Sequence, residues 1–172
     1  GPDSPGVLAL VRQWVEAGNA YAVIGNHEIN LLRDDAKDGS GWYFDERIEA
    51  DNRKYAPYQR ANAQFSAEML PFLCTLPLGL EREDLRIVHA AWLSDAITAT
   101  RALQNNSVAR DYDVLEDAAA AHAQALGIPA RMAAENAAWP YSLEDMAHKP
   151  PVMPAHADSE LNKSMFNPLK VL

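Results

Sequence analysis

Ala20-Tyr21-Ala22-Val23-Ile24-Gly25-Asn26-His27-Glu28 joins an apolar run to a glycine that is followed by three polar side chains. The run at 20–24 is rich in residues that favour strands and predicts a short buried strand, and residues 29–33 predict a short helix. Such a strand, ending at Gly25, places Asn26 and His27 at its carboxyl end, where open α/β sheets bind ligands. We therefore expect a functional site at this point.

A helix is predicted before this strand. Ser4 is a suitable N-cap with Pro5 at the first helical position, and Gly18 is a suitable stop, so the predicted helix covers residues 4–18. Its apolar residues recur at spacings of three and four, which predicts one buried face made of Val7, Leu8, Val11, Trp14 and Val15.

A polar loop is predicted at 34–41, after the short helix. Its aspartates lack the spacing of a calcium-binding EF-hand loop, so a solvated loop is favoured. The aromatic residues at 42–44 either line a substrate cleft or anchor the loop to the core. Residues 45–70 alternate acidic and basic side chains, which indicates a solvated helical surface rather than a basic patch.

A β-hairpin is predicted at 78–89. Two short apolar runs, 78–81 and 85–89, flank the polar connection 82–84. The second strand ends at His89, which two alanines follow. A histidine at a strand end is commonly structural, and His89 gains functional weight only if another site lies nearby.

The second half of the chain is alanine-rich and predicts helices at 94–103, 111–126 and 131–146, with a break near Trp139. Residues 105–107 and 127–129 are the predicted connections, and 149–154 is a proline-rich extended segment. We expect His122 on the surface, and His148 and His156 in loops without metal-ligand spacing.

Composition restricts the classes of function. The chain has 172 residues, enough for one domain, and a formal net charge of -9. This charge argues against a nucleic-acid-binding surface, which needs clustered Lys and Arg. A single cysteine, Cys74, favours a reducing compartment and hence a cytoplasmic location. No apolar run reaches transmembrane length, so no membrane association is expected.

Two motifs resemble signature blocks of the calcineurin-like metallophosphoesterase superfamily. Gly25-Asn26-His27-Glu28 is similar to the block Gly-Asn-His-Asp/Glu, and Val88-His89-Ala90 is similar to the block with a strand-terminal His. Gly1-Pro2-Asp3-Ser4 is similar to the continuation of the second block in the branch of Ser/Thr protein phosphatases and diadenosine tetraphosphatases. The resemblance covers residues 1–93.

The resemblance implies an α/β fold, a calcineurin-like two-sheet sandwich flanked by helices. Residues 1–93 then form a partial metallophosphoesterase core, 94–148 a helical insertion or cap, and 149–172 a segment that returns toward the core. The implied activity is that of a phosphatase-like hydrolase with two divalent metal ions and a hydroxide that bridges them. Manganese is the favoured metal, with iron or zinc as alternatives.

The resemblance also assigns roles to individual residues. Asn26 and His89 are implied metal ligands, and His27 is the implied general acid that protonates the leaving oxygen. The substrate is a phosphoprotein, a nucleotide or a small phosphomonoester, and the oligomeric state stays open. We expect Asn26 and His89 to face one point, with His27 beside it.

Other blocks of the family signature have no match here. Asp-x-His and Gly-Asp-x-x-Asp-Arg are expected upstream of Gly1, and no Gly-His pair follows His89. Two matched ligands cannot hold a two-metal centre, so these residues alone are expected to bind metal weakly or not at all. The alternative is a catalytically incomplete or degenerate homologue that acts as a protein-binding module through its helical second half.

Overall fold

The computed structural model describes residues 1–103, 107–141 and 147–172, which form two compact units. Among these residues, the first unit comprises 1–92, 107–110 and Leu172, and the second comprises 93–103, 111–141 and 147–171. The sequence placed the end of the core at residue 93, one residue beyond this division. The expected return segment, 149–172, lies in the second unit except for Leu172.

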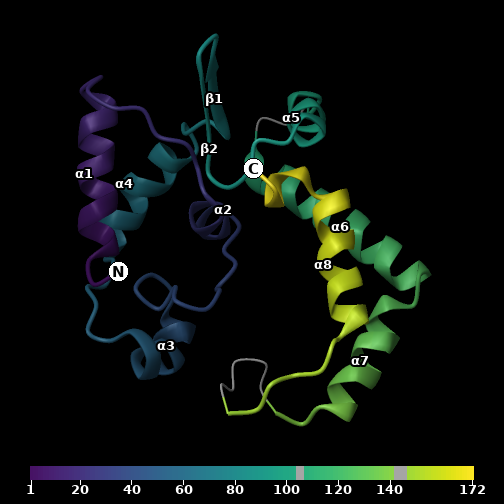
Figure 1. Ribbon diagram of the computed structural model, residues 1–172. Coiled ribbons are helices and arrows are strands. Elements are labelled where there is room, and N and C mark those ends of the chain that lie inside the picture. Colours follow the sequence, from purple (N-terminus) through teal and green to yellow (C-terminus); the bar gives the residue numbers. More distant parts are fainter. Residues whose placement is uncertain (104–106, 142–146) are drawn as a thin grey trace. The chain divides into compact units, whose positions relative to one another are not determined.

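Helices dominate the described residues (Figure 1). The first unit contains α1 (Ser4–Glu16), α2 (Asn26–Leu32), a 3₁₀ turn (Asp45–Arg47), α3 (Ile48–Tyr55), α4 (Ala63–Leu73), β1 (Gly79–Arg82) and β2 (Leu85–Val88). The second unit contains α5 (Ser94–Arg101), most of α6 (Val108–Ala125), α7 (Ile128–Ala138), α8 (Pro154–Phe166) and a 3₁₀ turn (Pro168–Lys170). The helix predicted at 131–146 ends at Ala138. Residues 142–146 of this predicted helix lie outside the described residues, as do residues 105 and 106 of the predicted connection at 105–107.

The predicted α/β two-sheet sandwich is wrong for this chain. In the part that the structure describes, the only sheet is the antiparallel pair β1–β2. Residues 20–24 are not a strand: Ile24 N donates to Pro77 O at 2.9 Å, but among the described residues the backbone groups of 20–23 form no hydrogen bond. Because strands exist only as hydrogen-bonded ladders, the apolar run alone does not make one.

Local capping signals fix the bounds of α1. Asp3, rather than the predicted Ser4, is the N-cap, and its Oδ1 accepts from Gly6 N at 2.8 Å. At the other end Gly18 has a φ of 72°, its N donates to Val15 O, and Asn19 N donates to Trp14 O. These two bonds form a Schellman motif, for which glycine is favoured because it tolerates a positive φ. The predicted stop at Gly18 is therefore confirmed.

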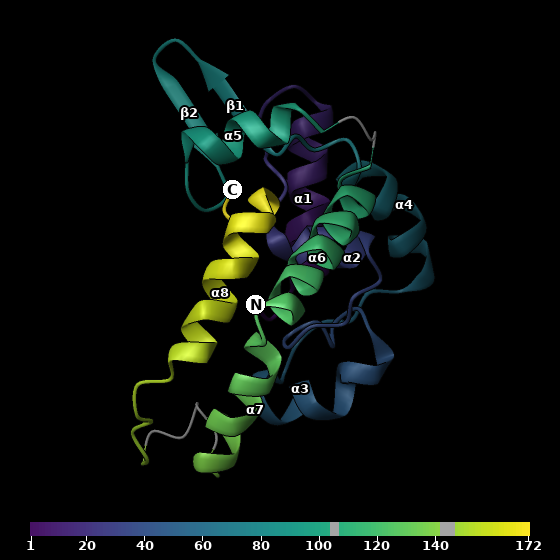
Figure 2. The same cartoon turned by 90° about the vertical axis from the view of Figure 1, so that its right-hand side faces the viewer.

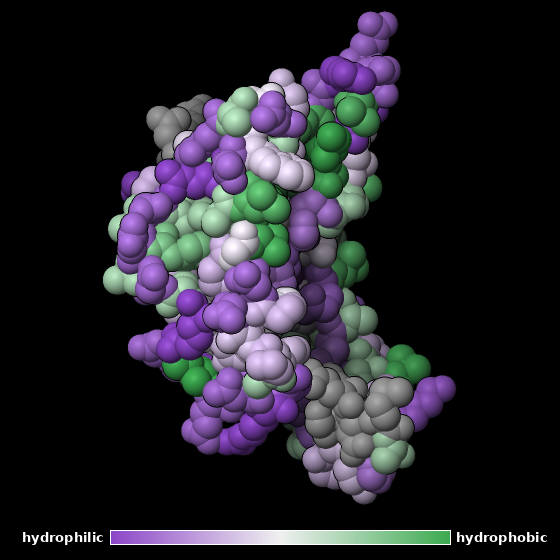
Figure 3. All heavy atoms as spheres, turned by 90° about the vertical axis from the view of Figure 1, so that its left-hand side faces the viewer, coloured by the Kyte–Doolittle hydropathy of each residue, from purple (hydrophilic) through white to green (hydrophobic). Residues whose placement is uncertain are grey.

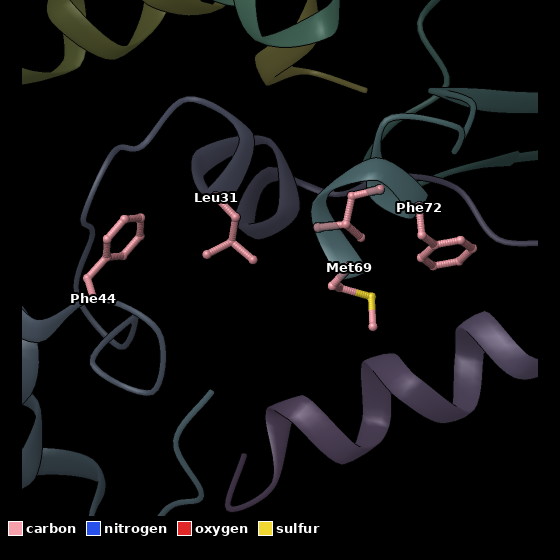
Figure 4. Close-up of a cluster of buried hydrophobic side chains, with 5 residues drawn as sticks. Leu31, Phe44, Met69 and Phe72 are labelled. Atoms are coloured by element: carbon pink, nitrogen blue, oxygen red, sulfur yellow. The ribbon is translucent and has the colours of Figure 1, made fainter. Parts of the chain in front are cut away.

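A small apolar core holds the first unit together. Leu31, Phe44, Met69, Phe72 and Leu73 are buried in one cluster, contributed by α2, α4 and the segment before α3 (Figure 4). Helix α1 packs beside α4 and covers this cluster with one side only, through Leu8, Val11 and Val15. The cluster explains why three short helices stay together with little sheet.

The outer side of α1 is apolar and exposed. Val7, Leu10 and Trp14 are 62%, 48% and 53% exposed, so Val7 and Trp14 do not belong to a buried face as predicted. Hydrophobic residues are visible over α1 and the hairpin on this face of the molecule (Figure 3). The spacing of three and four identifies apolar sides of a helix, but the breadth of the neighbouring core decides how much of them is buried.

The hairpin positions His89 as predicted. β1 and β2 pair antiparallel from Gly79 with Val88 to Arg82 with Leu85, and a two-residue turn joins them (Figure 2). His89 follows the last paired residue directly. Ala90 N then donates to Leu172 O at 2.6 Å, which fixes the chain just after His89.

Polar contacts between helices organise the second unit. His156 lies on α8, not in a loop, and its Nδ1 is 2.8 Å from Glu135 Oε2 on α7. Glu135 also accepts from Ala155 N at 2.7 Å, so it caps the start of α8. His122 on α6 contacts Asn162 at 2.6 Å and lies against the Phe166 ring. The sequence did not predict α8, whose cap comes from a residue about 20 positions earlier.

Glu135 makes the stability of the second unit depend on pH. Partial burial by itself raises the pKa of Glu135. The hydrogen bonds from Ala155 N, from the His156 ring nitrogen and from His156 backbone N outweigh this effect, so the pKa is lowered from 4.5. Stabilisation is therefore present above pH 4.5 and is lost as the pH falls through the folded pKa. We expect the Tm, followed through Trp139 fluorescence, to drop in this acidic range and Glu135→Gln to flatten that drop. An unchanged profile in the variant contradicts the assignment.

Among the described residues, no helix has both the length and the apolar character needed to cross a lipid bilayer.

Candidate functional site

The structure brings Asn26 and His89 together. Asn26 Oδ1, at the start of α2, lies 3.1 Å from His89 Nε2, which follows β2, although the two residues are 63 positions apart in the chain. Both side chains are exposed. The two side chains are therefore adjacent as expected, but residues 20–24 do not form the strand at whose end Asn26 was expected.

Gly25 allows this close approach. A Cβ at residue 25 would lie 2.8 Å from His89 Nδ1 and 2.9 Å from Glu28 Oε2, closer than side chains tolerate. Glycine therefore lets the His89 and Glu28 side chains lie close over residue 25, and a Cβ there would make both side chains shift. The residue precedes α2 in an extended conformation, with φ −108° and ψ 177°, so the close approach rather than a positive φ requires glycine.

Glu28 has a structural role that the sequence analysis missed. Its Oε2 accepts from Gly25 N at 3.1 Å, so the side chain reaches back over the first turn of α2. This contact resembles half of a capping box, whose sequence signal is a Glu three residues after the N-cap. Glu28 thereby fixes Gly25, and with it the direction in which Asn26 and His27 leave the backbone.

His27 lies beside the pair, as expected. It lines a hollow of about 470 Å³ that His89 and Glu28 also line, together with residues of the N-terminal stretch and α1. The His27 side chain is exposed, so it can exchange protons with a bound molecule. His27 and His89 thus line one hollow, and Asn26, which precedes His27 in the chain, contacts His89.

A second hollow adjoins the first. It has a volume of about 400 Å³, and its walls include the aromatic residues Trp42, Tyr55 and Tyr58. The two hollows share His27 and Trp42. Of the aromatic residues at 42–44, Phe44 is in the core and Trp42 and Tyr43 pack against it, so the anchoring interpretation is confirmed. Trp42 also lines both hollows, and the interpretation as a substrate cleft stays a prediction.

Carboxylates in the second hollow are paired. Asp38 accepts from the Tyr55 hydroxyl at 2.6 Å, and it is 2.8 Å from Arg47 and 3.1 Å from Lys54. The Tyr55 hydrogen bond, followed by Lys54 and Arg47, lowers the pKa of Asp38, and the same bond raises the pKa of Tyr55. Asp35, which does not line this hollow, is paired with Arg33 and Lys37. These aspartates hold the loop to its basic neighbours.

Asn26 and His89 fit as two neighbouring ligands of one divalent ion. Ligands bound at about 2.1 Å and at right angles lie about 3 Å apart, close to the 3.1 Å observed. The same distance also fits a direct hydrogen bond, in which His89 Nε2–H donates to Asn26 Oδ1 when Nε2 carries the proton. Within the described residues, no group of three His, Cys, Asp or Glu side chains could hold a metal ion. Two side chains do not make a two-metal centre, so the described residues alone do not form one.

Comparisons with models of protein families, with curated protein sequences and with solved structures find no match to this chain. The assignment of a function consequently rests on the motifs and on the geometry of the site.

Proposed function

We propose that this chain carries part of the active site of a metal-dependent phosphoesterase, a hydrolase of phosphate esters. The observation that supports the proposal is the 3.1 Å approach of Asn26 Oδ1 to His89 Nε2, with His27 lining the same part of the first unit. An amide oxygen and an imidazole nitrogen at this spacing suit Mn²⁺, Fe²⁺ or Zn²⁺. Manganese is the metal we favour, and the resemblance implies two ions.

Each residue has a distinct task in this proposal. Asn26 is a neutral oxygen ligand, which leaves the positive charge of the metal available to the phosphate. His89 is a nitrogen ligand whose position is fixed by the end of β2 and by the contact with Gly25. Divalent ions supply a deprotonated water as nucleophile and neutralise phosphate charge. The remaining ligands come from polypeptide outside these residues.

His27 acts as the general acid. Water oxygen bonds to phosphorus while the bond from phosphorus to the ester oxygen breaks, and His27 donates a proton to the departing oxygen. Its exposed position on the hollow allows it to regain this proton from solvent. The substrate class is a phosphoprotein, a nucleotide or a small phosphomonoester. The single free cysteine, Cys74, favours a cytoplasmic location.

One observation favours a second candidate, a protein-binding module. In the second unit, a hollow of about 560 Å³ between α5 and the end of α8 is lined by Leu93, Ala96 and Met165. Leu93 and Met165 are more than half exposed. An exposed apolar surface of this kind suits a protein partner.

Manganese-dependent hydrolysis of 4-nitrophenyl phosphate by the full-length protein of the encoding gene tests the first proposal. We expect activity that requires the metal and falls by about a hundredfold or more in Asn26→Ala and His89→Ala, because each removes a ligand. His148→Ala, a histidine of the second unit, is the matched control and should keep its rate. Inactivity with every metal refutes the phosphoesterase and leaves the protein-binding module. Full activity in His89→Ala refutes the role of His89 as a metal ligand.

A further inference from the structure

We propose that the second hollow, which we call the aromatic pocket (Trp42, Tyr55 and Tyr58), binds an uncharged aromatic alcohol as the leaving group. The preferred substrates are then phosphomonoesters of aromatic alcohols. This inference rests on the proposed function for its catalytic meaning, but the aromatic pocket itself can be tested by binding alone.

His27 connects the two hollows. It lines the hollow that contains His89 and also the aromatic pocket. A general acid must lie within hydrogen-bond reach of the ester oxygen that it protonates. With phosphate on the His89 side, the group attached to that oxygen extends past His27 into the aromatic pocket.

The walls of the aromatic pocket suit a flat apolar ring. Tyr55 is 48% exposed, and the bond from its hydroxyl to Asp38 holds its ring in place. Trp42 packs edge to face on Phe65, with ring centroids 6.0 Å apart, so its position is also fixed. Rings that are already ordered lose little conformational entropy when a ligand packs on them, and aromatic pairs gain beyond simple burial. The volume of about 400 Å³ is in the range of small-molecule sites.

Charge disfavours an anionic leaving group. The lining of the aromatic pocket includes Asp38 and Asp51 and contains no Lys or Arg. The nearest cations are already engaged, because Arg47 bonds both aspartates and Lys54 bonds Asp38. A leaving group with further phosphates or carboxylates therefore meets two carboxylates and no Lys or Arg side chain among the lining residues. A neutral aromatic alcohol avoids this cost.

Binding of the product-like alcohol tests the aromatic pocket on the chain described here. We expect 4-methylphenol to shift the indole N–H signal of Trp42 in ¹H–¹⁵N NMR spectra in a saturable manner. Cyclohexanol, of similar size but without a π system, should bind about threefold to tenfold more weakly. The indole signals of Trp14, Trp92 and Trp139 are internal controls. No saturable shift at Trp42, or equal binding of the two alcohols, overturns the inference.

Variants at Tyr55 separate the ring from its hydroxyl. Tyr55→Ala should weaken 4-methylphenol binding about threefold to tenfold, whereas Tyr55→Phe keeps the ring and should bind within about twofold of the parent. Tyr21→Ala, at a tyrosine that is 88% exposed and outside both hollows, is the matched control. Equal binding in Tyr55→Ala and Tyr21→Ala contradicts the role of Tyr55.

Kinetics distinguish failure of the pocket from failure of the function. In the full-length protein we expect the ratio of kcat/KM for phenyl phosphate to kcat/KM for cyclohexyl phosphate to fall in Tyr55→Ala, because this substitution leaves the chemistry of both leaving groups unchanged. An unchanged ratio in Tyr55→Ala refutes the aromatic pocket and keeps the phosphoesterase. Saturable 4-methylphenol binding in a protein that hydrolyses neither ester refutes the phosphoesterase and keeps the pocket.

Discussion

His27→Asn is expected to slow hydrolysis of an alkyl phosphate by the full-length protein on the order of a hundredfold to ten thousandfold. This is the range that a positioned general acid contributes, because the alkoxide it protonates is a poor leaving group. Asparagine has a similar size and still forms hydrogen bonds, so it removes proton transfer with little change in packing. His27 is exposed, so the substitution should leave the fold intact.

The dependence on the leaving group makes this prediction specific. An ester of 4-nitrophenol, whose anion leaves readily, should lose much less rate in His27→Asn than an alkyl ester does. Steady-state kcat for both esters, in the parent protein and in His27→Asn, provides the measurement. Equal rate losses for both esters argue for a structural role of His27, and a full rate with the alkyl ester rules out general acid catalysis by it.

Asp51→Ala is expected to lower the free energy of unfolding of the first unit by about 3 kcal/mol. Asp51 on α3 is 1% exposed, its Oδ2 accepts from Gly41 N at 2.6 Å, and its Oδ1 accepts from Arg47 at 3.0 Å. The substitution leaves Gly41 N without its acceptor in a buried place. Arg47 retains Asp38, so the loss is smaller than for a cation left entirely unpaired.

Urea unfolding followed by Trp42 fluorescence and far-ultraviolet circular dichroism measures this change. Asp51→Asn keeps an acceptor oxygen for Gly41 N and should cost less than Asp51→Ala. Asp45→Ala is the surface control, since Asp45 is exposed and pairs only with Arg60 on the surface, and it should change stability by about 0.5 kcal/mol or less. Equal losses in Asp51→Ala and Asp45→Ala contradict the anchoring role of Asp51.

The site was accessible from the sequence because its residues belong to local motifs. Asn26 and His27 follow Gly25 within one tetrapeptide, and His89 ends a hairpin strand, so each position was defined by short-range signals. The family resemblance implied that Asn26 and His89 would meet, and in the structure they lie 3.1 Å apart. The capping contact of Glu28 and the aromatic pocket were not foreseen, because Tyr55 and Tyr58 are brought to Trp42 by the path of the loop and α3.

The sequence by itself determined the features that depend on neighbouring residues. Asp3 and Gly18 bound α1, and the turn after Arg82 closes the hairpin, because caps and turns are encoded within a few positions. Only the tertiary structure decided that residues 20–24 stay unpaired, that α1 buries one side, and that Glu135 caps α8. Strand pairing, burial and long-range caps each need a partner distant in the chain, and an apolar pattern or a propensity does not specify that partner.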